Sequence, residues 1–208
     1  MNAARHPGTQ EAPSPRAEAI LAAVMPVFGR YGFKKTSVDD LAAAAGLSKQ
    51  GLYLHFASKE ELFLQATRHY LDVGLALVDQ ALAREGAALQ DRIVDAMDAW
   101  FGRHLVTYSP EALDVIAAGD QLAGDAVDGY KAGFRDRLAR ALRQSPGFID
   151  RSTVTAEELA AVLFTFGLTW KEGRKSRAEF VAQMRLCVRA CLPAPRKAAR
   201  AAASKGVA

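Results

Sequence analysis

The sequence has little that would mark a secreted, membrane or redox protein. It contains two cysteines, Cys187 and Cys191, in 208 residues, too few for a disulfide framework. The N-terminus lacks the basic and then apolar layout of a signal peptide. The longest largely apolar run, LAAVLFTFGLTW at residues 159–170, is too short to cross a bilayer. We therefore expect a cytoplasmic protein with no membrane partner, and both cysteines packed as small apolar side chains in the core face of a helix.

The part of the chain that we expect to fold also carries no excess of positive or negative charge. The sequence carries 27 Lys and Arg against 23 Asp and Glu. The tail from Pro193 onward holds Arg196, Lys197, Arg200 and Lys205 and no acid, so the remainder is neutral. We expect this tail to be disordered, and basicity alone does not indicate nucleic-acid binding.

Recognisable catalytic and metal-binding motifs are absent. The four histidines, His6, His55, His69 and His104, do not have the spacing of metal ligands, and neither a nucleophile motif nor a phosphate-binding glycine loop is present. The sequence thus predicts no catalytic residue, no metal and no cofactor. An enzyme remains an alternative, because catalytic groups can converge from distant positions.

No stretch alternates with period two, and the patterns that are present are helical. Apolar residues recur at helical spacing from Ala17 to Tyr31, where Pro26 should kink or weaken the helix. Thr36 and Ser37 can each cap the next helix, with Asp39 and Asp40 three residues on, and Gly46 can close it. Further helices are expected after Ser58 with Glu61, near 88–107, from Ser109, over 120–143, after Thr155 with Glu158, and after Ser176 with Glu179.

The segment SKQGLYLHF, residues 48–56, is the most informative. Gly46 ends the preceding helix and Ser48 can cap a new one, which favours a short helix over a strand. At about 100° per residue, a helix with Leu52 and Phe56 in the core turns Gln50 and Leu54 to the outside. Its outer side thus offers an amide and an apolar group, with a phenol on the flank.

A helix, a tight turn and a second helix form a helix-turn-helix, whose second helix can enter the DNA major groove. There Gln50 suits adenine, Lys49 suits guanine or phosphate, and Leu54 suits a thymine methyl. Gly51 would let the backbone come close to the duplex. The alternative is a small helical subdomain whose polar residues are merely solvated.

Residues 17–63 resemble the N-terminal domain of the TetR family of bacterial transcriptional regulators. The resemblance covers about a quarter of the chain and includes YGF, TSVDDLA, AGLSK and SKEELF. It implies a homodimer that binds a palindromic operator in double-stranded DNA, usually as a repressor. It also implies the following DNA contacts: Lys49, Gln50 and Gly51 after the cap Ser48 at base edges; Tyr53, His55 and Lys59 on phosphate or sugar; and Thr36 or Ser37 on phosphate.

The expected fold is all-α, with an N-terminal three-helix DNA-binding domain and a C-terminal helical domain for ligand binding and dimerisation. The expected divisions are a flexible arm at 1–15, the helix-turn-helix domain at 16–60, the helical domain at 61–192 and the basic tail at 193–208. By resemblance, the last two helices form a four-helix dimer interface, although their apolar stripes also fit an intramolecular core.

A small apolar or aromatic effector would fit the composition of the C-terminal part. The candidate pocket residues are Met97, Trp100, Phe101, His104, Tyr108, Phe134, Phe164 and Trp170. The effector would favour a conformation in which the two recognition helices no longer fit successive major grooves. A ligand-independent architectural DNA-binding protein is the other alternative, and it would bind with little sequence preference.

Overall fold

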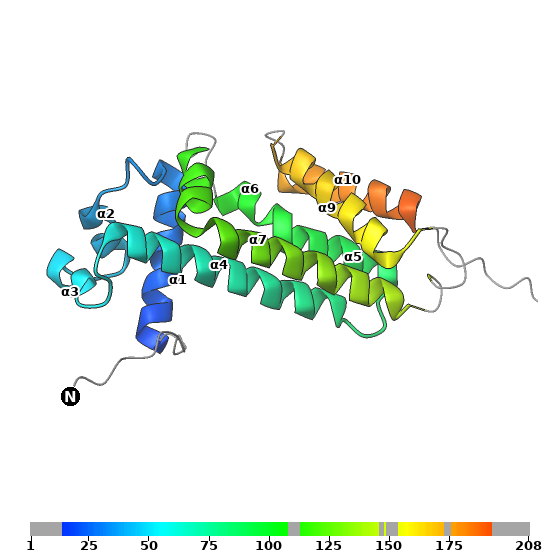
Figure 1. Cartoon of the computed structure of the whole chain (residues 1–208), viewed down its shortest axis with the longest axis horizontal. Coiled ribbons are helices and arrows are strands. Elements are labelled where there is room, and N and C mark those ends of the chain that lie inside the picture. The colour runs from blue at the N-terminus through cyan, green and yellow to red at the C-terminus, as the bar shows by residue number, and fades with distance from the viewer. Residues whose placement is uncertain (1–13, 108–112, 146–147, 149–153, 173–175, 193–208) are drawn as a thin grey trace, which may run out of the picture. The chain divides into compact units, whose positions relative to one another are not determined.

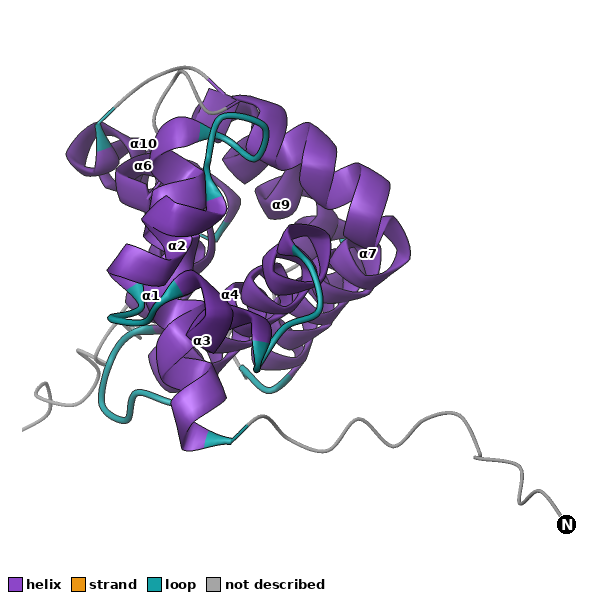
Figure 2. Cartoon of the chain, turned by 90° about the vertical axis from the view of Figure 1, so that its left-hand side faces the viewer, coloured by secondary structure: helices purple, strands orange, loops and turns teal. Residues whose placement is uncertain are grey.

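The computed structural model describes residues 14–107, 113–145, 148, 154–172 and 176–192. Over these ranges the chain contains only helices and loops, as Figure 2 shows, so the predicted all-α class is confirmed. The chain divides into two compact units, Met1–Leu71 with Tyr108–Gly124, and Asp72–Thr107 with Asp125–Ala208. The boundary predicted at residue 60 falls at the start of the helix Lys59–Leu82, and it stays a prediction.

The first unit contains the helices that the DNA-binding hypothesis requires. They are α1 (Pro15–Tyr31), α2 (Val38–Ala44), α3 (Lys49–Tyr53), α4 (Lys59–Leu82) as far as Leu71, and α7 (Leu113–Arg143) as far as Gly124 (Figure 1). The helix α1 continues through Pro26, which is exposed. Phe63 of α4 lies 5.0 Å from Phe28 and 4.9 Å from Phe33 between ring centroids. These rings join buried aliphatic side chains in one apolar core.

Short polar side chains fix where α2 begins. Ser37 is its N-cap and forms a capping box with Asp40, as predicted. The expectation that Thr36 also caps α2 is wrong, because the Thr36 hydroxyl donates to the carbonyl of Gly32 at 2.6 Å. Thr36 is 2% exposed, and pairing within the protein satisfies its buried hydroxyl.

The start of α4 differs slightly from the predicted capping box. Ser58 accepts a hydrogen bond from the Glu61 amide at 3.0 Å, as expected. The Glu61 carboxylate, however, accepts from the amide of Ala57 and from the side chain of Gln65. It therefore binds the chain one residue before the cap.

The second unit contains the rest of α4 and α7 together with the remaining helices. These are α5 (Leu89–Met97), the π-helical turn η1 (Asp98–Gly102), α6 (His104–Thr107), α9 (Ala156–Glu172) and α10 (Arg177–Cys191) (Figure 1). The capping boxes at the starts of α9 and α10 form as predicted, between Thr155 and Glu158 and between Ser176 and Glu179. The predicted helix start at Ser109 lies outside the described residues.

The single helix expected near 88–107 is interrupted by the wider turn η1. There the amide of Arg103 donates to the carbonyl of Asp98, five residues back, at 3.2 Å. Apolar spacing does not reveal an extra residue in one turn, which explains the difference. Single π turns are often found at functional positions, and this one carries Trp100 and Phe101.

The last helix packs its predicted apolar stripe only in part. Phe180, Met184 and Val188 are buried in the core, whereas Cys187 is half-buried and Cys191 is exposed. The expectation that both cysteines lie in a core face is therefore wrong for Cys191. Burial, together with the neighbouring Cys191, raises the pKa of the Cys187 thiol to about 11, so little of it is the reactive thiolate at neutral pH.

None of the helices in the described ranges combines the length and apolarity needed to span a bilayer.

Candidate nucleic-acid interface

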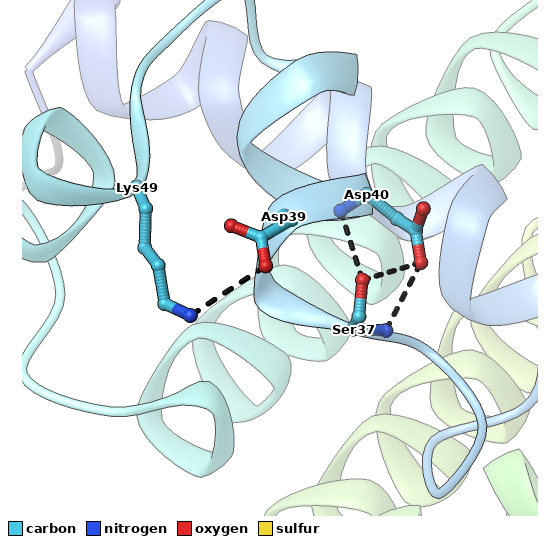
Figure 3. Close-up of polar contacts among 4 residues, drawn as sticks. All are labelled: Ser37, Asp39, Asp40 and Lys49. Carbon is cyan, nitrogen blue, oxygen red and sulfur yellow. Dashed lines mark hydrogen bonds and ion pairs between the residues drawn. The ribbon is translucent and has the colours of Figure 1, made fainter.

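Two short helices, α2 and α3, form the helix-turn-helix. The sequence predicted the residues that cap them, Ser37 and Ser48. Ser37 accepts from the amide of Asp40 at 3.1 Å, and the Asp40 carboxylate accepts from the Ser37 amide at 3.2 Å (Figure 3). The Ser37 hydroxyl and amide, in that order, hold the pKa of the Asp40 carboxyl below its usual value. The start of α2 is thus fixed, with two acids, Asp39 and Asp40, in its first turn.

The turn after α2 depends on Gly46. Its φ of +64° lies in the left-handed region, which favours glycine, as predicted. The amides of Gly46 and Leu47 donate to carbonyls at the end of α2. Ser48 then caps α3 by accepting from the amide of Gly51 at 3.0 Å. The chain therefore reverses within a few residues and begins a second helix at once.

Burial determines which face of α3 is available. Leu52 and Phe56 are 2% and 3% exposed and lie in the core of the first unit. On the other side, Leu54 is 87% and Tyr53 44% exposed. Gln50 and His55 are exposed as well. The structure therefore gives α3 the orientation predicted for SKQGLYLHF, with an amide, a phenol and an apolar group at the surface.

A Cβ atom on Gly51 would lie 3.3 Å from the Ser48 hydroxyl oxygen. Asp40 and Glu61 carry side chains at the same position after their own caps, Ser37 and Ser58. The cap of α3 therefore does not require glycine, and the close approach of Gly51 to DNA stays a prediction.

Two of the predicted phosphate contacts are engaged within the protein. The Thr36 hydroxyl is buried and bonded to Gly32. Of the two residues predicted to contact phosphate at the start of α2, only Ser37 is therefore exposed. The Lys59 ammonium donates to the Thr36 carbonyl at 3.0 Å and lies 4.6 Å from the centre of the Phe33 ring. An ammonium has three donors, so this hydrogen bond uses only one of them, and the contact of Lys59 with phosphate stays a prediction.

Lys49 and Asp39 form an ion pair between the two helices. The Lys49 Nζ atom lies 3.5 Å from Asp39 Oδ2, and both side chains are largely exposed. Figure 3 shows the Lys49 side chain extending toward Asp39, while Asp40 turns to Ser37. From the sequence we expected Asp39 only to follow the possible cap Thr36 and to lie as an acid at the helix N-terminus. Its contact with Lys49 depends on how α2 and α3 cross, which no local pattern reveals.

Most of the described effector candidates lie together in the second unit. The Trp100 and Phe134 rings stack at 5.1 Å, and Phe101 lies 5.7 Å from Phe134 and 5.5 Å from Phe164. Met97 is also buried, and His104 is half-buried. Tyr108 and the side chain of Trp170 lie outside the described residues. The described rings pack on one another as core, so their role as ligand contacts stays a prediction.

A close helix approach supports this aromatic cluster. A Cβ atom on Gly167 of α9 would lie 2.4 Å from Phe101 Cε2. Only glycine therefore lets α9 lie this near the π turn. A ligand that entered here would have to separate rings that now touch.

The first unit therefore defines a helix-turn-helix protein. Residues 20–66 match the family model for "Bacterial regulatory proteins, tetR family". The N-terminal region is thus similar to the TetR family, in agreement with the resemblance seen in the sequence.

A curated relative shows the same similarity over part of its length. The HTH-type transcriptional regulator RutR of Escherichia coli strain K12 is 40% identical over 63 residues, which are 30% of this chain and 30% of RutR. The chain spans less than half the length of the curated relatives it matches first.

Two solved structures extend the likeness to most of the chain. A transcriptional regulator from Rhodococcus sp. Rha1 has a TM-score of 0.64 at 20% identity, covering 85% of this chain and 95% of that one. AibR in complex with isovaleryl coenzyme A and operator DNA has a TM-score of 0.55 at 21% identity, covering 86% of this chain and 98% of AibR. These likenesses show that the fold is shared.

Proposed function

We propose that the chain is a transcriptional regulator that binds a palindromic operator in double-stranded DNA. The observation that carries this proposal is the exposed face of α3. Leu52 and Phe56 anchor the helix, and Gln50, Tyr53 and Leu54 remain outside. An exposed amide and an exposed leucine match the hydrogen-bonding atoms and thymine methyls of the major groove. The match of residues 20–66 to the TetR family supports the same function.

The backbone contacts that we propose lie around this face. Ser37 caps α2, and the ammonium of Lys59, the first residue of α4, reaches the same place by donating to the Thr36 carbonyl. Helix amides and an ammonium there suit phosphate oxygens. Tyr53 and His55 are exposed at the end of α3. Lys49 and Gln50 would read base edges, and Gly51 leaves room for the duplex. Contacts with the DNA backbone fix the orientation of the helix, whereas contacts with base edges select the sequence.

The proposed active form is a homodimer, because a two-fold protein matches a palindromic site. Surface apolar side chains support an interface on the last two helices. Val162 of α9 is 54% exposed and Leu186 of α10 is 58% exposed, and α9 packs against α10. Apolar groups clustered on adjacent exposed helices favour burial by a second copy.

We further propose that a small apolar or aromatic effector releases the protein from DNA. The aromatic cluster around Phe101 and Phe134 supports an effector of this class. AibR, which has a similar fold, was solved in complex with isovaleryl coenzyme A and operator DNA, and this supports a regulator that responds to a small ligand. Coupling of about 1–3 kcal/mol between the two sites is typical of such regulation. Such a protein would act in the bacterial cytoplasm and would not be an enzyme.

Selection from a pool of random DNA duplexes tests the proposal. The purified full-length protein is incubated with the pool at physiological salt, and bound duplexes are amplified and sequenced. An enriched palindrome supports a sequence-specific dimer. Binding without enrichment would support an architectural protein instead, and absence of binding would contradict the proposal.

A further inference from the structure

We propose that Asp39 is a specificity-determining residue of the DNA-binding surface and that it acts by positioning Lys49. This inference rests on the proposed function. It assigns to α2 a role in sequence discrimination, in addition to its role in packing against α3.

The geometry at the two helices singles out Asp39. Its carboxylate oxygen lies 3.5 Å from the Lys49 ammonium at the first turn of α3. The neighbouring Asp40 is held by three hydrogen bonds with Ser37. Figure 3 shows these two acids engaged in different directions, with Asp39 toward α3. Asp39 is therefore the acid that directs Lys49.

Stability does not explain this ion pair. The side chains of Lys49 and Asp39 are 52% and 72% exposed, and exposed pairs of this kind contribute little to folding. The pair nevertheless lies at the N-terminus of α3, the helix that we propose to face DNA.

Chemistry indicates which base the pair would favour. One ammonium donor is directed to Asp39, which leaves two for DNA. Guanine presents two neighbouring acceptors, O6 and N7, in the major groove, whereas adenine presents one acceptor beside an amino donor. A Lys49 held in one place by Asp39 can use both guanine acceptors. We therefore expect guanine at the position that Lys49 faces.

The carboxylate also limits binding to the wrong sequences. A free lysine would be drawn to the nearest phosphate of any duplex and would release counterions there. Asp39 offsets that attraction, because it places a negative charge beside the ammonium. Specificity is a difference between affinities, so weakening unspecific binding raises it.

The test is a double-mutant cycle in the full-length protein. Asp39→Asn keeps the size of the side chain and removes its charge, and Lys49→Gln removes the ammonium. Wild type, both single variants and the double variant are titrated with the enriched duplex, its guanine-to-adenine variant and an unrelated duplex, over a series of salt concentrations. Glu85→Gln, on an exposed loop residue of the second unit, is the control for the change in net charge.

We expect Asp39→Asn to bind the unrelated duplex about three- to tenfold more tightly, with the salt slope steeper by about 0.9. Its preference for guanine over adenine should fall. In the Lys49→Gln background, Asp39→Asn should change neither the guanine preference nor the slope. Glu85→Gln should behave like wild type, and Asp39→Glu should restore most of the preference because it keeps the carboxylate.

Equal effects of Asp39→Asn with and without Lys49 would overturn the inference, because Asp39 would then only repel phosphates. An unchanged guanine preference in Asp39→Asn would overturn it as well. Failure of the wild type to prefer the enriched duplex over the unrelated one would instead refute the proposed function.

Discussion

Alanine substitutions of Leu52 in α3 and of its C-cap Leu54 should have opposite effects on folding and on DNA binding. Leu52 is 2% exposed and lies in the core of the first unit, whereas Leu54 is 87% exposed. Replacing either with alanine removes the same three carbon atoms. The structure places Leu52 in the core, and our proposal places Leu54 against DNA, so the two variants serve as controls for each other.

The expected magnitudes differ clearly. Leu52→Ala leaves a cavity in a packed core and should lower the free energy of unfolding by about 2–5 kcal/mol. Leu54→Ala, at the surface, should change it by less than about 0.5 kcal/mol. At about 0.8 kcal/mol per buried carbon and partial coverage by a thymine methyl, Leu54→Ala should cost on the order of 1 kcal/mol in operator affinity, or about fivefold.

Denaturant unfolding followed by circular dichroism measures the first quantity. Fluorescence anisotropy with the enriched duplex measures the second, at a temperature at which both variants are folded. If Leu54→Ala binds the duplex as wild type does and Leu52→Ala unfolds as wild type does, the orientation that we assign to α3 is wrong.

Three further predictions follow from other parts of the structure. Gln50→Ala should lose base preference at one or two operator positions when selected against the random pool; a site identical to that of wild type would show that Gln50 does not read bases. Gly167→Ala forces a Cβ atom into Phe101 and should lower the free energy of unfolding by about 1–3 kcal/mol, whereas unchanged denaturation would contradict the close packing. Val162→Glu with Leu186→Glu should shift analytical ultracentrifugation from dimer to monomer and weaken operator binding; a dimer that persists would place the interface elsewhere.

Local patterns predicted the framework of the helix-turn-helix in the first unit well. The Ser37 and Asp40 capping box, the left-handed Gly46 and the Ser48 cap all formed as expected. Each of these features depends on residues within four positions of one another. The inward turn of Leu52 also followed from helical periodicity alone.

Features that depend on tertiary contacts could not be predicted from the sequence. The burial of Thr36 depends on the path of the chain after α1, and the contact of Lys49 with Asp39 depends on the crossing of α2 and α3. The π turn at Asp98–Gly102 inserts a residue that no apolar spacing reveals. Exposure of Cys191 likewise depends on where α10 leaves the core.

Hydrogen–deuterium exchange of the full-length protein, with and without the enriched duplex, tests whether α2 and α3 bind DNA. We expect protection on binding to concentrate in residues 36–59, which include the start of α2, the turn and α3. Protection confined to the basic residues after Pro193, or to α9 and α10, would contradict it.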